Sequence, residues 1–269
     1  MSDKIYVARA ALHAWEEPCI SGNRGSGTIF FGGCSLKCIF CQNRNISRGR
    51  AGKEIGVERL AEIMIELEEK GAHNINLVTP THFAPSVKEA VSLSRSRGMS
   101  LPIVYNTSSY DTAETLRALC GTVDIYLADF KYFTEKSARE LSMAPNYPKT
   151  ARDTIGEMVA QTGTPTFDEH GIMLRGTVVR VLLLPAHVAE AKLTVKYLYD
   201  TFGDSIIISL MNQYTPIGSL PAPLDRRVTR EEYRQLTEYA DRIGVRHAYV
   251  QDRESASESF IPEFDCEGV

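Results

Sequence analysis

The sequence predicts a parallel α/β fold of about six strands. Short runs rich in Val, Ile and Leu alternate with segments whose apolar residues recur at helical spacing. Strands that read as continuous apolar runs are typical of parallel sheets covered by helices on both faces. Six βα units fit a partial or full barrel as well as a doubly wound sheet, and the pattern alone does not separate these. Because no internal repeat or low-complexity linker is present, we expect residues 1–269 to form a single domain.

The elements follow one another in a regular order. The first strand, 27–33, precedes a helix over 57–70 that ends at Gly71. Further strands are predicted over 74–78, 102–106, 124–130, 176–185 and 205–210, and further helices over 85–97, 186–201 and 229–243. A helix is expected to begin behind Asp111 with Glu114 at its third position, and Thr229 with Glu232 predicts a capping box. The longer segment 132–172 predicts two helices.

Composition narrows the function classes. The chain has a net charge of −4, so nothing indicates a nucleic-acid partner. It contains no apolar run long enough to cross a membrane, and its first residues lack the apolar core of a signal peptide. We therefore expect a cytoplasmic protein that binds neither nucleic acid nor membrane. Clustered cysteines in that reducing compartment favour metal binding or catalysis over disulfides.

Three of the six cysteines, Cys34, Cys38 and Cys41, stand directly after the first predicted strand. Parallel α/β folds place their chemistry at the carboxyl ends of the strands. Three thiolates can hold three irons of a [4Fe–4S] cluster and leave the fourth iron open for a ligand. The alternative is a structural zinc site with Cys19 or His13 as fourth ligand. Cys120 and Cys266 are expected to be ordinary residues.

The stretch C-S-L-K-C-I-F-C resembles the CxxxCxxC signature of the radical S-adenosylmethionine (SAM) superfamily. The segments EEPCISGNRGSGTIFFGGCSLKCIFCQN, NLVTPTHFAP, YNTSSYD, YLADFKY and SLMNQYTP are similar to its PflX-like branch, which is related to pyruvate formate-lyase activating enzyme. The resemblance implies a partial TIM-type barrel, a [4Fe–4S] cluster on the three cysteines, and SAM bound at the open iron. It also implies reductive cleavage of SAM to a 5′-deoxyadenosyl radical that abstracts a hydrogen atom from the substrate.

The resemblance further implies which residues contact SAM. Phe40 is expected near the adenine, although an ordinary core position is an equal alternative. Thr79-Pro80-Thr81 stands where many relatives carry Gly-Gly-Glu for the SAM amino group, so the hydroxyls of Thr79 and Thr81 are candidates for that contact. His82, next to them, is either an acid/base group on the substrate side or a hydrogen-bonded loop residue.

Polar residues at three further strand ends complete the expected site. Asn106 and Thr107 follow the third strand, where the activating enzyme carries an Asp-Thr pair close to the SAM carboxylate and a monovalent cation. Asp129 and Lys131 lie two residues apart and therefore on one face of the fourth strand. Arg180 interrupts an apolar strand and needs a carboxylate or a polar ligand group as partner. For Asp129 and Lys131 the alternative to SAM binding is a salt bridge at the rim of the barrel. For Arg180 the alternative is a structural ion pair with Asp129.

Other polar segments are weaker candidates. Asn212, Gln213 and Tyr214 follow the sixth strand, where the activating enzyme has a histidine, and either position substrate or make ordinary loop hydrogen bonds. His13, Glu16 and Glu17 are expected to form a charged surface loop rather than to face the site. We expect the segment 132–172 and the tail 251–269 to border the opening of the site.

The sequence therefore predicts a radical SAM oxidoreductase that resembles glycyl-radical-enzyme activases. The leading function is abstraction of a glycine α-hydrogen from a partner glycyl radical enzyme. The alternative is a stand-alone enzyme that modifies a small molecule or a peptide, and a non-enzymatic metal-binding module is disfavoured by the polar strand ends. Because no further cysteine clusters are present, one cluster is expected, and an external reductant such as flavodoxin or ferredoxin is implied.

Overall fold

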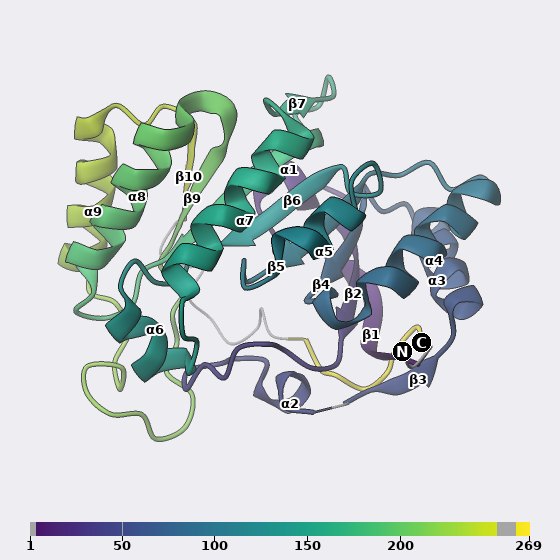
Figure 1. The fold of residues 1–269 in the computed structure, drawn as a ribbon, viewed down its shortest axis with the longest axis horizontal. Helices are drawn as coiled ribbons and strands as arrows, with labels where there is room; N and C mark the ends of the chain where they lie inside the picture. Colours follow the sequence, from purple (N-terminus) through teal and green to yellow (C-terminus); the bar gives the residue numbers. More distant parts are fainter. Residues whose placement is uncertain (1–3, 50, 252–261) are drawn as a thin grey trace.

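The computed structural model describes residues 4–49, 51–251 and 262–269. Its main sheet has the strand order β10-β9-β8-β6-β5-β4-β2-β1-β3. The strands from β2 through β4, β5, β6, β8 and β9 to β10 are parallel, whereas β1 and β3 are antiparallel additions at one edge. Figure 1 shows the long helices as a layer in front of this sheet. This mostly parallel α/β sheet has the architecture of a partial TIM-type barrel, as predicted.

All six predicted strands are present. They are β2 (Ser26–Phe31), β4 (Ile75–Val78), β5 (Ile103–Thr107), β6 (Ile125–Asp129), β8 (Met173–Leu182) and β9 (Ile207–Met211). The helices after these strands include the long α3 (Val57–Glu69), α4 (Ala84–Ser96), α7 (Tyr147–Thr162), α8 (Val188–Phe202) and α9 (Arg230–Ile243) and the shorter α5 (Ala113–Ala118) and α6 (Glu135–Ser142). Segment 132–172 thus contains two helices, α6 and α7, as the sequence predicts.

Several short elements were not predicted. They are β1 (Ile5–His13), β3 (Lys53–Ile55), β7 (Thr166–Phe167), β10 (Ala248–Val250), α1 (Pro18–Ser21) and α2 (Arg44–Ser47), together with the 3-10 turns η1 (Thr81–Phe83) and η2 (Gly203–Ser205). β1 is the longest of them, and a register shift between Val7 and Arg9 interrupts its alternation of buried and exposed residues. That irregularity hides the period of two by which a strand is recognised in a sequence.

One helix cap was predicted correctly and one was not. Thr229 and Glu232 form the expected capping box at the start of α9. Helix α5, in contrast, is capped by Thr112, whose side chain accepts a hydrogen bond from Thr115 N. Asp111 is buried and its carboxylate accepts hydrogen bonds from Thr81, Tyr105 and Thr107 instead. The expectation of a cap at Asp111 was wrong because the interior offers this carboxylate three hydroxyl donors.

The inner face of the sheet has an apolar level and a polar level. Val104, Leu127, Val178 and Ile207 pack with Cys19 and Ile20 of α1 in one buried cluster. Two residues farther along each of these strands, the same face carries Asn106, Asp129, Arg180 and Ser209. Helix α1 therefore fills the lower part of the barrel, and polar side chains gather above it at the carboxyl ends of the strands.

The C-terminal residues pack along the edge of the sheet beside β3 (Figure 1). Cys266 N donates to Ala8 O at 3.0 Å and Ala10 N donates to Glu267 O at 2.8 Å, so this segment bonds to the edge of β1 next to the residues that pair with β3. Lys53 Nζ donates to Val269 O at 2.8 Å. Phe264 packs edge-on against Phe30 of β2. Residues 252–261 of the predicted tail lie outside the described residues.

Gly32, between β2 and the cysteines, provides a test of this packing. A Cβ atom at Gly32 would lie 2.2 Å from Ala51 O. We expect Gly32→Ala to lower the free energy of unfolding by about 1–3 kcal/mol, because the backbone of the following loop must move. Urea unfolding measures the loss. Gly156→Ala in α7 is the control, since nothing lies within 4 Å of its added methyl group and the helix should be unchanged or stabilised. Equal stability of Gly32→Ala and the wild type would contradict the close approach.

Candidate active site

The loop after β2 brings the three predicted cysteines together. Gly33, with φ of +95°, turns the chain away from the strand, and its N–H donates to Ile46 O at 2.8 Å. Cys41 N then donates to Cys38 O at 3.3 Å, so the last two cysteines share one tight turn. Cys34 stands at the start of the same loop, directly after Gly33.

Each thiol of the loop has a different polar neighbour. Cys34 Sγ accepts from Leu36 N at 3.4 Å, and Cys41 Sγ lies 3.4 Å from Ser47 Oγ. Cys38 Sγ, the most buried of the three, accepts from Ser142 Oγ at 2.9 Å. Burial raises the pKa of Cys34 to about 11 and also raises that of Cys38, while the nearby Lys131 ammonium opposes both shifts. Lys131 thus favours negative charge on these sulfurs.

A structural zinc site was the alternative to a cluster on the three cysteines. No three His, Cys, Asp or Glu side chains in the described ranges are grouped as ligands of one metal ion. In a [4Fe–4S] cluster each thiolate binds its own iron, so its sulfurs need not converge on one point. Cys19 lies in the apolar cluster around α1, and His13 stacks edge-on against Phe30. Cys120 is exposed and Cys266 lies in the C-terminal segment beside β1.

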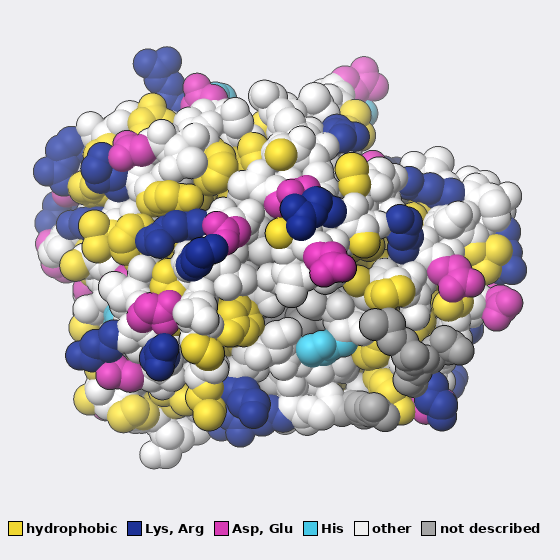
Figure 2. Space-filling view, in the orientation of Figure 1, with side chains coloured by type: hydrophobic (Ala, Val, Ile, Leu, Met, Phe, Trp, Pro, Cys, Tyr) yellow, Lys and Arg dark blue, Asp and Glu magenta, His cyan; other side chains and the backbone are white. Residues whose placement is uncertain are grey.

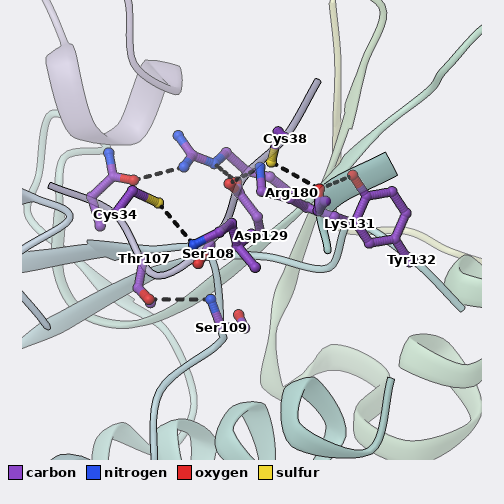
Figure 3. Close-up of polar contacts among 12 residues, drawn as sticks. Cys34, Cys38, Thr107, Ser108, Ser109, Asp129, Lys131, Tyr132 and Arg180 are labelled. Carbon is purple, nitrogen blue, oxygen red and sulfur yellow. Dashed lines mark hydrogen bonds and ion pairs between the residues drawn. The ribbon is translucent and has the colours of Figure 1, made fainter. Parts of the chain in front are cut away.

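Arg180 lies at the centre of a buried charge network beside this loop. Its Nε donates to Asp129 Oδ1 at 2.7 Å, and its Nη2 donates to Asn106 Oδ1 at 2.7 Å. Lys131 Nζ donates to the other oxygen of Asp129, also at 2.7 Å. Figure 3 shows these charged side chains beside Cys38. Burial alone would raise the pKa of Asp129, but Arg180 and then Lys131 hold it below its ordinary value. Lys131 lies just beyond the end of β6 and not within the strand as predicted, but its ammonium group does reach the side of the strand on which Asp129 lies.

Glu16 is the site residue that sequence reasoning missed. Its Oε2 accepts from Arg180 Nη1 at 3.2 Å, and its Oε1 accepts from Asn76 Nδ2 at 3.0 Å and Asn106 Nδ2 at 3.2 Å. The expectation of a charged surface loop was therefore wrong, because the turn between β1 and α1 directs this carboxylate into the barrel. Burial raises its pKa, against the attraction of Arg180. The only signal in the sequence was the proximity of two acidic residues to the apolar segment that becomes α1.

Glu17 is also buried, and its Oε2 has no hydrogen-bond partner. Burial raises the pKa of Glu17 to about 7, although Arg180 opposes this shift. The interior of the barrel thus contains three carboxyl groups, from Glu16, Glu17 and Asp129, around one guanidinium group. Burial is the main cause of the raised pKa of both glutamates, and the neighbouring carboxyl groups add to it.

The predicted threonines have different surroundings. Thr81 Oγ1 donates to Asp111 Oδ1 at 2.7 Å, and Thr107 Oγ1 donates to Asp111 Oδ2. Both hydroxyls are thus engaged with one buried carboxylate. Thr79 follows β4 with φ of +59°, and its N–H donates to Asn106 O at 2.9 Å. Such a backbone conformation is uncommon for a β-branched residue and marks the end of β4 as strained.

The remaining candidates lie around the same loop. Phe40 is buried and packs edge-on against Tyr214, with 5.8 Å between the ring centroids. His82 lies beside Gly33 and packs against Phe83. Asn212 N donates to Gln251 Oε1 at 3.1 Å, and Gln251 Nε2 donates to Gln213 Oε1 at 3.2 Å. The segment 212–214 therefore has the ordinary loop hydrogen bonds that were one of its two predicted roles.

Two cavities adjoin the cysteine loop. The smaller, of about 150 Å³, is polar and is lined among others by Glu16, Asn43, Asn106, Arg180 and Pro262. The larger is a groove of about 1080 Å³ between the loop, the start of β1 and helices α4 and α5, and it reaches Cys34, Thr81 and His82. Figure 2 shows that the visible face is hollowed near its centre, with a histidine side chain at the hollow.

The chain belongs to the radical SAM superfamily, whose family model matches residues 28–175. Members of this superfamily use a [4Fe–4S] cluster and S-adenosylmethionine, and the prediction of these cofactors is confirmed at the level of the family. The matched range begins in β2 and includes all three cysteines of the loop, β4, β5 and β6.

The sequence identity to individual proteins is low. An uncharacterized protein of Methanocaldococcus jannaschii is 28% identical over 251 residues, which are 89% of this chain and 68% of that protein. A radical SAM methyltransferase from Sphaerobacter thermophilus has a similar fold, with a TM-score of 0.59, 16% identity, and coverage of 84% of this chain and 66% of its own. The structure of anSMEcpe with bound AdoMet and Cp18Cys peptide gives a TM-score of 0.55 at 9% identity, over 81% of this chain and 60% of that one. The chain thus spans less than two thirds of these two solved chains.

The residues at the site fit such a cofactor pair. Three cysteines of one loop offer three thiolates, and the charged network beside them offers both a guanidinium group and carboxylates to a zwitterionic ligand. No helix within the described residues is long and apolar enough to cross a membrane.

The charge network leads to a prediction about SAM affinity. Arg180→Ala and Asp129→Ala should each weaken SAM binding and leave the iron content near that of the wild type, because neither residue contacts a cysteine sulfur. Each should also cost about 3–5 kcal/mol of stability, since a buried charge is left without its partner. Titration calorimetry on anaerobically reconstituted protein and urea unfolding measure the two effects.

Arg175→Ala on the same strand is the control for this pair. The Arg175 side chain donates only to the carbonyls of Gln161 and Thr162, away from the network. It should bind SAM as the wild type does. If Arg180→Ala and Asp129→Ala are folded and also bind SAM with wild-type affinity, the network is purely structural.

Proposed function

We propose that this chain cleaves SAM reductively and uses the radical chemistry to remove a hydrogen atom from a substrate held at the carboxyl ends of its strands. The observation that carries the proposal is the position of the three-cysteine loop directly beside the buried Arg180–Asp129–Lys131 network. A [4Fe–4S] cluster with SAM at its open iron supplies the one-electron chemistry when bound. The chain's own residues bind, orient and shield these groups.

In this proposal Cys34, Cys38 and Cys41 hold the cluster, and the strand ends hold SAM. Arg180 and Asn106 line the small cavity and are assigned to the carboxylate end of SAM, with Asp129 and Lys131 fixing the orientation of the guanidinium group. Phe40 is assigned to the adenine. The ends of β4 and β5 carry Thr79, Thr81 and Thr107, which are assigned a role in supporting the backbone there. The hydroxyls of Thr81 and Thr107 already donate to Asp111, which favours this role over a contact with SAM.

For the substrate, we propose first a glycine-bearing protein loop, as in glycyl-radical-enzyme activases. The supporting observation is the groove of about 1080 Å³ that is open along Cys34. An extended polypeptide segment requires such an open approach, whereas a small substrate is better served by a closed cavity. A low-potential one-electron donor of the flavodoxin or ferredoxin class would act as reductant.

A second candidate is direct modification of a small molecule or peptide. It is favoured by the polar cavity of about 150 Å³, whose wall includes Pro262 of the C-terminal segment as well as Glu16 and Arg180. In this second candidate the opposite charges of the cavity hold the two ends of a small zwitterionic substrate, and Arg180 is then a substrate contact in place of its contact with the SAM carboxylate. The two candidates differ in which of the two cavities receives the substrate.

The cysteine assignment leads to a direct prediction. Replacement of Cys34, Cys38 or Cys41 by alanine should abolish retention of about four irons per chain and the EPR signal that SAM perturbs, because each thiolate binds one iron. Cys120→Ala and Cys266→Ala are matched controls and should retain the cluster. Stoichiometric zinc without iron in anaerobically purified protein would contradict the radical reaction.

The substrate proposal is tested by SAM turnover. The release of 5′-deoxyadenosine by the reduced enzyme should be stimulated by a glycyl radical enzyme or a peptide of its glycine loop, and a glycyl EPR doublet should appear on that partner. Substitution Ala118→Trp in the wall of the groove should reduce this stimulation and leave SAM binding unchanged. No acceleration by any glycyl partner, together with turnover of a small zwitterion, would favour the second candidate.

A further inference from the structure

The sulfur of Cys38 receives a hydrogen bond from outside its own loop. Ser142, the last residue of α6, donates from Oγ to Cys38 Sγ at 2.9 Å, and Tyr132 OH lies 2.5 Å from the same Oγ. Figure 3 shows this chain of contacts running from the Tyr132 ring to the sulfur. Both Ser142 and Tyr132 are about 1% exposed, so water does not compete for either hydroxyl.

We propose that Tyr132 and Ser142 form a two-hydroxyl relay that raises the reduction potential of the cluster held by Cys38. This inference rests on the proposed function, because it assumes that Cys38 binds the [4Fe–4S] cluster. Ser142 and Tyr132 are positioning residues, since they act through the cysteine sulfur and not on the substrate.

The direction of the relay follows from proton counting. A thiolate bound to iron has no proton and can only accept a hydrogen bond. Each hydroxyl has one proton, so Ser142 must donate to the sulfur and Tyr132 must donate to Ser142. The second bond polarises the first and strengthens it.

The backbone fixes the geometry of this contact. Lys37 N donates to Ser142 O at 3.0 Å and Ile39 N donates to Leu141 O at 2.9 Å, so the residues on both sides of Cys38 are bound to the end of α6. Met143 ends the helix in the left-handed conformation with φ of +51°, which turns the chain away after Ser142. The Tyr132 ring is held edge-on against Tyr147, with 5.4 Å between centroids.

The chemical effect is electrostatic. Transfer of one electron from a low-potential donor to the oxidised [4Fe–4S]²⁺ cluster gives [4Fe–4S]⁺ and adds one negative charge. A hydrogen bond donated to a ligating sulfur stabilises the more negative state and so raises the potential. The other two sulfurs have no comparable contact with a buried hydroxyl pair within the described ranges, because Cys34 accepts only from a backbone N–H and Cys41 lies 3.4 Å from Ser47.

The test is an EPR-monitored redox titration of the anaerobically reconstituted full chain, with dithionite as electron donor. In Ser142→Ala the ratio of reduced to oxidised cluster at the wild-type midpoint should fall about tenfold, equivalent to about 59 mV toward negative potential for one electron. Tyr132→Phe should shift the potential in the same direction by less. Ser142→Thr keeps the hydroxyl and should restore the wild-type potential.

Two further variants separate the loss of the hydrogen bond to Cys38 from general effects on α6 and on folding. Ser137→Ala removes a hydroxyl from the same helix that contacts Glu190 and not a cysteine, and should leave the potential unchanged. The double variant Ser142→Ala/Tyr132→Phe removes both hydroxyls, so that no buried donor is left without a partner if the single variant folds poorly.

The outcomes separate the relay from the proposed function. A wild-type protein that binds no iron–sulfur cluster would overturn both. A normal cluster whose potential is the same in the wild type, Ser142→Ala and the double variant would overturn the relay alone. Lower iron content in Ser142→Ala with an unchanged potential of the remaining clusters would likewise reduce Ser142 to a structural contact and overturn the relay.

Discussion

The arrangement of the site depends on the hydrogen bonds that the buried guanidinium group of Arg180 donates. It bonds Asp129 on the neighbouring strand, Asn106 one strand farther, and Glu16 from the segment before α1. A charge removed from water is tolerated only where its hydrogen-bonding groups are satisfied, so these elements cannot shift independently. The position of Asp129 in turn fixes Lys131, which brings a positive charge next to the cysteine loop.

The two-level interior explains how such a polar centre coexists with a stable barrel. Parallel strands alternate their side chains between the helix layer and the interior, and here the interior positions change from apolar to polar within two residues. The apolar level packs against α1 and excludes water from the amino-terminal side of the polar residues. The polar level faces the end of the sheet where loops meet, which is where α/β proteins gather residues from several strands into one site.

The sequence predicted the parts of this architecture that depend on local pattern. Periodicity and spacing predicted the six strands and the position of the cysteines after the first of them. They also predicted that Asp129 and Lys131 lie on the same side of the sheet. Glu16 could not be placed in this way, because the direction of its side chain depends on partners 60 or more residues away. Asp111 could not be placed either, because its direction depends on three hydroxyl groups of the interior. The finer position within the superfamily stays a prediction, since the similarity to known structures concerns the fold.

Helix α6 connects the outer layer of the molecule with the cysteine loop. Glu190 of α8 accepts hydrogen bonds from Phe133 N and Thr134 N, both at 2.8 Å, and so holds the segment that leads into α6. At the other end of the helix, Ser142 contacts Cys38. Both ends of this eight-residue helix are therefore held, one by α8 and the other by the cysteine loop. The placement of Ser142 against Cys38 thus depends on the packing of α8 as well as on the loop itself.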